Sequence, residues 1–283
     1  MISDDERFQL ILNSDQNDLR YYFESPFHHY HKLTANQKFQ WFATDQQENI
    51  NREYREIDKI VYEFNSFGYR CDELTKSDLM FVGCSFTFGV GLPKQDVWSY
   101  LLAKEFDQPY INLSYPGGSL SYIQRTILKC FDVVMPRKIF VLIPYNYRFE
   151  FISTENPDFI KVWSKSGLSH KNFFGKDKER IYAYEIFTTK KNEEFEFLKS
   201  LFFINSYIKA RGCQLFWTEW QYDELPTAYF ESEKTKTIYG NYIESSVFNR
   251  HKRHESLSLK ARDGIHPSSQ FHRQYYQEVK KYV

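Results

Sequence analysis

Two short segments of the sequence carry the residue types that nucleophilic catalysis needs. The first segment, residues 83–89, has the sequence GCSFTFG and directly follows an apolar run. A serine at a turn from strand to helix projects its hydroxyl from the carboxyl edge of a sheet, and its own N–H can face an oxyanion. An ordinary turn would have the same composition, since glycine and serine are common in turns. Ser85 is therefore a candidate nucleophile, with the plain turn as the alternative.

The second segment lies near the C-terminus and has the sequence DGIHP at residues 263–267. A carboxylate at Asp263 can accept the Nδ1 proton of His266, which leaves Nε2 as a free base. An isolated Asp-His pair in a loop is most often solvated surface. Together with Ser85, however, the pair completes a set of nucleophile, base and orienting acid.

Alternating apolar runs and helical patterns surround these segments and indicate what positions them. The patterns predict strands at 79–83, 110–113, 139–143 and 215–218, and helices at about 97–106, 122–134 and 193–210. A last helix is expected from Ser268, with Ser268 or Ser269 as its cap. Strands that alternate with helices predict an α/β fold with a parallel sheet covered on both faces, whose functional groups gather at the carboxyl ends of the strands.

The alternation begins only after about residue 75, which suggests a division of the chain. Residues 1–75 are predicted to form an N-terminal extension, in which the NSFGYR segment at 65–70 forms a hairpin or an extended arm. Residues 76–283 form the α/β domain, with an insertion at about 150–190, where aromatic residues, lysine and asparagine mix without a clear period.

Composition excludes several classes of protein. The 37 Lys and Arg residues balance 37 Asp and Glu residues, so no charge excess favours nucleic acid or an anionic membrane. No apolar run is long enough to span a bilayer, and the acidic first residues do not resemble a secretory signal, so we expect a cytoplasmic protein. We expect neither cofactor nor metal, because dinucleotide and P-loop motifs are absent and no C-x-x-C pair joins the scattered cysteines, which we expect to be reduced and buried.

Four segments in order resemble the motif blocks of the SGNH, or GDSL-type, hydrolase superfamily. They are GCSFTFG at 83–89, NLSYPGG at 112–118, the asparagine at 146 and DGIHP at 263–267. The NSFGYR segment also resembles a lead-in that often precedes the first block in bacterial and phage members. The resemblance covers about residues 79–283 and implies a flavodoxin-like three-layer α/β/α fold.

The resemblance also implies roles for individual residues. Ser85 would be the nucleophile, His266 the base and Asp263 its partner. The oxyanion hole would consist of the N–H groups of Ser85 and Gly117 and the side chain of Asn146. Two departures stand out. Cys84 replaces the aspartate that usually precedes the nucleophile, and the third block keeps only Asn146 of the usual G-x-N-D pattern.

The expected activity is a serine esterase that removes a short acyl group, an O-acetyl group on a carbohydrate. Trp220 and Tyr222 are candidate sugar-stacking residues. Arg148 would either hold an anionic part of the substrate or pair with Glu150. Two alternatives use the same scaffold: a non-catalytic carbohydrate-binding or virion structural module, and an acyltransferase with the same triad. The abundance of aromatic residues, lysine and asparagine also fits a phage genome, and hence a virion-associated protein.

Overall fold

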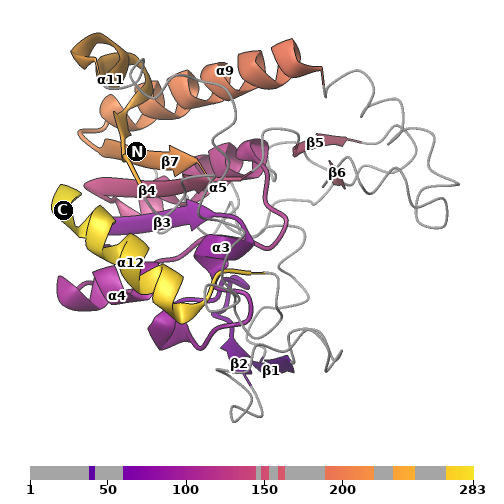
Figure 1. Ribbon diagram of the computed structural model, residues 1–283, viewed down its shortest axis with the longest axis vertical. Coiled ribbons are helices and arrows are strands. Elements are labelled where there is room, and N and C mark those ends of the chain that lie inside the picture. The colour runs from indigo at the N-terminus through magenta and orange to yellow at the C-terminus, as the bar shows by residue number, and fades with distance from the viewer. Residues whose placement is uncertain are drawn as a thin grey trace, which may run out of the picture.

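A four-stranded parallel sheet forms the centre of the computed structural model (Figure 1). The structure describes residues 60–144, 148–150, 189–219, 232–245 and 266–283, together with the backbone of 38–41, 151–152 and 159–162. The sheet comprises β3 (Leu79–Gly83), β4 (Lys138–Ile143), β7 (Gln214–Glu219) and β8 (Asn241–Tyr242), in that order. The predicted α/β fold is confirmed.

The segment predicted as the second strand runs along the outer edge of β3. It makes a single parallel bridge between Phe81 and Asn112, with hydrogen bonds from the Phe81 N–H to the Ile111 carbonyl (3.0 Å) and from the Leu113 N–H to the Phe81 carbonyl (2.8 Å). If this segment is counted as the second strand of the sheet and β3 as the first, the strands lie across the sheet in the order 2-1-3-4-5. Flavodoxin-like folds have this order. The strand order therefore reverses at β3. This position is the topological switch point of the sheet, and folds of this kind bind ligands there.

Helices cover both faces of the sheet (Figure 1). They are α3 (Ser85–Phe88), α4 (Trp98–Glu105), α5 (Leu120–Val134), α9 (Lys190–Lys209), α11 (Glu233–Tyr239) and α12 (Ser269–Val279), with 3₁₀ turns at η4 (Lys94–Asp96) and η7 (Lys280–Tyr282). Helices α4 and α12 pack together on one face, and α5 and α9 on the other. Ser268 caps α12 by accepting the Phe271 N–H, as predicted.

The strands are apolar along most of their length because both faces are buried. Phe81, Phe140 and Phe216 are register partners on neighbouring strands, and their rings stack with centroids 5.7 and 5.2 Å apart. Trp98 of α4 meets this ladder edge-on at Phe81. Trp217 points to the opposite face, where it contacts Phe197 of α9. The core therefore fills the space on both sides of the sheet.

The chain before the sheet contributes to the same core. Strands β1 (Lys38–Trp41) and β2 (Ile60–Glu63) pair antiparallel. A turn follows in which the side-chain oxygen of Asn65 accepts the N–H groups of Phe67 and Tyr69. Phe67, Tyr69 and Cys71 are buried in the cluster that includes the sheet. The division into residues 1–75 and 76–283 stays a prediction.

Most of the predicted insertion at 150–190 lies outside the described residues. Its described part is an antiparallel pair, β5 (Phe149–Ile152) and β6 (Phe159–Val162). No helix in the described residues is long and apolar enough to cross a membrane.

All four cysteines are free and buried, as the sequence predicts. Burial raises the pKa of the Cys130 and Cys213 thiols to about 12, and it also raises the pKa of Cys71. At neutral pH these three side chains are protonated thiols that behave as small apolar groups.

Candidate active site

The candidate nucleophile lies directly beyond the carboxyl end of β3. Cys84 is the N-cap residue of α3, in an extended conformation, and Ser85 is the first residue of this one-turn helix. The Ser85 carbonyl accepts the N–H groups of Gly89 (3.0 Å) and Val90 (3.1 Å). Gly89 ends the helix with φ +76°, a conformation that favours glycine. The sequence prediction of a serine at a strand-to-helix turn is confirmed.

Gly83 allows the turn to be tight. A Cβ at this position would lie 2.5 Å from Thr87 Oγ1 of the following helix, so the helix can pack against the strand end only if residue 83 has no side chain. The Asn112 side chain supports the helix from the neighbouring segment, because its amide donates to the Thr87 carbonyl at 2.7 Å. The first and second motif blocks are thus joined through Thr87.

The second block places Gly117 beside the same strand end. Tyr115 to Gly118 form a turn closed by a hydrogen bond from the Gly118 N–H to the Tyr115 carbonyl, with Gly117 at φ +76°. Proline followed by glycine at the centre is typical of a type II turn. Tyr115 N–H donates to the Gly83 carbonyl at 3.3 Å, and a Cβ on Gly118 would lie 3.1 Å from the same oxygen.

His266 lies against the residue next to the candidate nucleophile. Its half-buried ring meets Phe86 edge-on, with centroids 5.7 Å apart. No hydrogen bond joins Ser85 to His266, although the structure describes both residues. Four other predicted site residues lie outside the described residues: Asp263, Asn146, Trp220 and Tyr222. The structure therefore brings together Ser85, Gly117 and His266 at one edge, and the rest of the predicted site stays a prediction.

A second histidine near this edge has a structural role that the sequence analysis missed. His272 of α12 is buried, and its Nδ1 accepts the N–H of Trp98 at the start of α4 (3.1 Å), where Val97 provides no side-chain cap. Burial, reinforced by the nearby charges of His266 and Arg70, lowers the pKa of His272 to about 3. The signal was present in the sequence, because His272 occupies a core position of the last helix.

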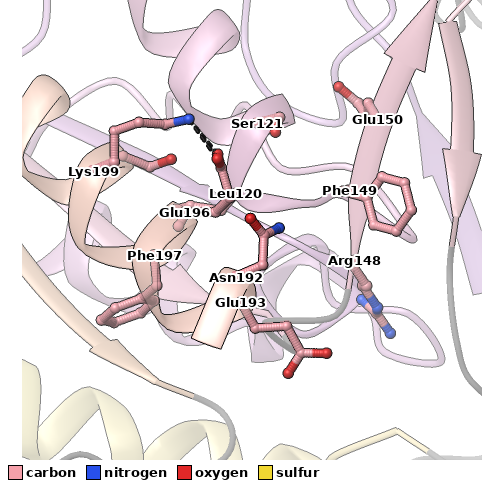
Figure 2. Close-up of a pocket in the computed structure, with 11 residues that line it drawn as sticks. Leu120, Ser121, Arg148, Phe149, Glu150, Asn192, Glu193, Glu196, Phe197 and Lys199 are labelled. Carbon is pink, nitrogen blue, oxygen red and sulfur yellow. Dashed lines mark hydrogen bonds and ion pairs between the residues drawn. The ribbon is translucent and has the colours of Figure 1, made fainter. Parts of the chain in front are cut away.

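Arg148 lines a cavity of about 240 Å³ between α5, β5 and α9 (Figure 2). Figure 2 shows the side chain of Asn192 near the centre of the lining residues and the ring of Phe149 at one side. The cavity begins at Leu120, two residues after Gly118, so the second motif block leads directly into its wall. The α9 residues that line it were not predicted, because a polar helix start gives no sign that it faces a cavity.

Buried ionisable groups lie on α5, β5 and β7, and one of them, Glu150, lines the cavity. Arg125 Nη2 and Glu150 Oε2 are 2.5 Å apart, and both side chains are almost inaccessible to solvent. Lys129 lies one turn further along α5, and burial, reinforced by the charge of Arg125, lowers its pKa to about 7. At the end of β7, burial raises the pKa of Glu219 to about 8.

No cluster of three or more metal-ligating side chains occurs in the part of the chain that the structure describes. No protein-family model and no curated protein sequence matches the chain.

Solved structures do match it. An acetyl xylan esterase, Est2A from Butyrivibrio proteoclasticus, is 10% identical, with 80% of this chain and 66% of that chain covered and a TM-score of 0.44. The esterase EstA from Pseudoalteromonas sp. is 13% identical, with 72% and 98% covered and a TM-score of 0.42. A putative lipolytic protein of the G-D-S-L family from Desulfitobacterium hafniense is 10% identical, with 72% and 98% covered and a TM-score of 0.43. These are likenesses of fold.

Proposed function

We propose that the protein is a serine esterase of the SGNH type. One observation carries the proposal: Ser85 begins a helix at the carboxyl end of β3, and the Gly117 turn packs against the end of the same strand. His266 supports it, because its ring lies against Phe86, the neighbour of Ser85. The three groups come from segments far apart in the sequence, and the proposed site lies at the switch point of the sheet.

In the proposed reaction, His266 takes the proton of the Ser85 hydroxyl as the oxygen attacks an ester carbonyl. The N–H groups of Ser85 and Gly117 and the amide of Asn146 hold the oxyanion. The alcohol leaves with the proton from His266, and water then releases the acid from the acyl-enzyme by the reverse sequence. Asp263 keeps the imidazole in the required tautomer. Catalytic hydrogen bonds are often long or unformed before substrate binds, and the Ser85–His266 bond would form then.

The proposed substrate is a short acyl ester, an O-acetyl group, on a carbohydrate. The cavity beside the second motif block supports a hydrophilic alcohol, because Asn192, Arg148 and Glu193 line it together with the ring of Phe149. Planar polar side chains around an aromatic ring suit the hydroxyl groups and apolar face of a sugar. Trp220 and Tyr222 remain proposed stacking residues.

The first experiment is labelling with a fluorophosphonate, followed by intact-mass measurement. This probe reports an activated serine without needing the true ester. We expect one adduct on the wild type and none on Ser85→Ala or His266→Ala. Ser114→Ala is the matched control, since Ser114 is a buried serine that follows the neighbouring segment of the sheet, and it should label like the wild type. An adduct that persists in Ser85→Ala, or no adduct on folded wild type, would contradict the proposal.

Two related functions remain distinguishable by experiment. The first alternative is a carbohydrate-binding module, in which Ser85 would not need to be an activated nucleophile. It is favoured by Cys84, which gives α3 no side-chain cap. Sugar binding that survives Ser85→Ala together with His266→Ala, without release of acetate by the wild type, would favour that function. Transfer of the acyl group to an added acceptor sugar would identify an acyltransferase.

A further inference from the structure

Arg70 is a deeply buried cation whose hydrogen-bond acceptors all lie on one short segment. Its residue is 2% exposed. Nη1 donates to the carbonyls of Phe88 (3.1 Å) and Gly89 (2.8 Å), and Nη2 donates to the carbonyl of Leu92 (2.7 Å). Among the described residues, no carboxylate forms an ion pair with it. A guanidinium is costly to bury, and here three backbone carbonyls offset part of that cost.

The three carbonyls belong to the segment that leaves the helix of Ser85. Phe88 and Gly89 end α3, and the N–H groups of Gly89 and Val90 hold the Ser85 carbonyl. The last carbonyls of a helix lack partners within the helix and carry partial negative charge, which a cation satisfies. Any displacement of residues 88–92 would therefore be passed directly to the backbone of Ser85.

A tyrosine from β2 completes the arrangement. The Arg70 guanidinium carbon lies 4.1 Å from the centroid of the Tyr62 ring, and the Tyr62 hydroxyl accepts the Gly91 N–H at 2.8 Å. Tyr62 also stacks on Phe88. The guanidinium is thus held between an aromatic face and the carbonyls, a geometry that a planar cation satisfies and an ammonium does not.

We propose that Arg70 is a positioning residue for Ser85. It fixes residues 88–92 from the segment that precedes the sheet, and through them the orientation of the Ser85 hydroxyl and N–H. This inference rests on the proposed esterase function. Its consequence is that loss of the guanidinium slows the reaction of Ser85 by more than loss of stability explains, because a displacement of about 1 Å costs on the order of 100-fold in rate.

The test compares the rates of fluorophosphonate labelling of wild type, Arg70→Lys and Arg70→Ala, each at a temperature where circular dichroism shows it folded. Lys138→Ala is the matched control. Lys138 also donates to two backbone carbonyls, those of Tyr282 and Val283, and lies over an aromatic ring, that of Phe216, but at the amino end of the sheet.

We expect labelling of Arg70→Ala to slow on the order of 100-fold, with Arg70→Lys intermediate. Lys138→Ala should lose stability and label at the wild-type rate. Millimolar methylguanidinium should restore part of the labelling rate of Arg70→Ala, because it fits the space that the side chain leaves.

The outcomes separate the two proposals. No labelling of wild type overturns the esterase function itself. Wild-type labelling with equal rates for Arg70→Ala and Lys138→Ala overturns the positioning role and leaves the esterase intact. If Arg70→Ala does not fold, Tyr62→Phe decides: it removes the hydroxyl that holds Gly91 and keeps the ring. An unchanged labelling rate in both Tyr62→Phe and Arg70→Lys would then overturn the proposal.

Discussion

The two faces of the sheet are built from different chemistry. On the face of α4 and α12, several aromatic rings pack together, and the buried imidazole of His272 has a lowered pKa that keeps it neutral. The rings that form this face are Phe81, Trp98, Phe140, Phe216 and Tyr275. On the face of α5, the interior holds the Arg125–Glu150 ion pair and Lys129.

In the proposed function, the difference would separate the scaffold from the face that lies nearer the ligand. Aromatic packing stabilises a fold without the cost of desolvating charge. A buried ion pair gives little net stability, because desolvation offsets the attraction between the two charges. Of these charges, Glu150 lines the cavity together with Arg148, so in the proposed function the ion pair would help to shape a polar site.

The largest loss of stability is expected when a buried aromatic side chain on the face of α4 and α12 is truncated, because a cavity remains. Trp98 is buried, meets Phe81 and Tyr275 edge-on and begins α4. Trp98→Ala should lower the free energy of unfolding by roughly 3–5 kcal/mol, measured by urea denaturation. Because the two faces are packed separately, Trp98→Ala should change the α5 face little, and the lowered pKa of Lys129 should persist. A return of that pKa toward its usual value would show that the two faces are coupled.

The charged face should respond differently to single and double changes. Glu150→Leu removes the carboxylate that pairs with Arg125, and should cost roughly 3–5 kcal/mol of unfolding free energy. Arg125→Met combined with Glu150→Leu should recover most of that loss, because both buried charges are then gone. A double variant as unstable as the single one would contradict the view that this pair contributes little net stability.

Lys129 should give the fold a dependence on alkaline pH. Its folded-state pKa of about 7 lies below the usual 10.5, so between these values the unfolded chain binds more protons than the native one. Stability should therefore rise with pH across this window, by at most about 1.4 kcal/mol per pH unit. Lys129→Met should remove the slope and stabilise the protein at neutral pH. Urea denaturation of both proteins at pH 7, 8 and 9 measures the dependence of the unfolding free energy on pH.

His272 should also make stability rise with pH, but in the acidic range, and its substitution should have the smallest effect. Its folded-state pKa of about 3 lies below the usual 6.5, so protons favour the unfolded chain in that window and stability falls as pH falls through it. His272→Gln keeps a side-chain oxygen that can accept the Trp98 N–H and removes the titration. We expect a cost of about 1 kcal/mol at pH 7 and a smaller loss of stability between pH 6.5 and 4 than in wild type.

The elements with a strong period were predictable from the sequence. The strand at 79–83 has the predicted bounds, and the predicted helix at 122–134 is α5, two residues longer at its start. Apolar runs of this kind admit few other structures when both faces of a sheet are buried. The segment at 110–113 was predicted as a full strand and is a single bridge at Asn112, because pairing depends on partners that a local pattern does not encode.

Other features depend on contacts between distant residues. Helix α11 has the polar sequence EKTKTIY and β8 has two residues, so neither has a pattern to detect. The segment NSFGYR was recognised as a motif, but nothing in it indicates that Arg70 reaches the carbonyls of Phe88 and Gly89. Ser85 could be proposed because a serine at a strand end is visible locally, whereas Gly117 came only from the resemblance of the second block.

The buried thiols make the native protein nearly inert to alkylating reagents, since only the thiolate reacts and burial raises the pKa of Cys71 and Cys213. A thiol is then alkylated only when local opening exposes it, so the alkylation rate measures how often that opening occurs. Cys71 directly follows Arg70, whereas Cys213 precedes β7. The ratio of their alkylation rates in one sample would report how often the segment that holds Ser85 detaches while the sheet remains intact.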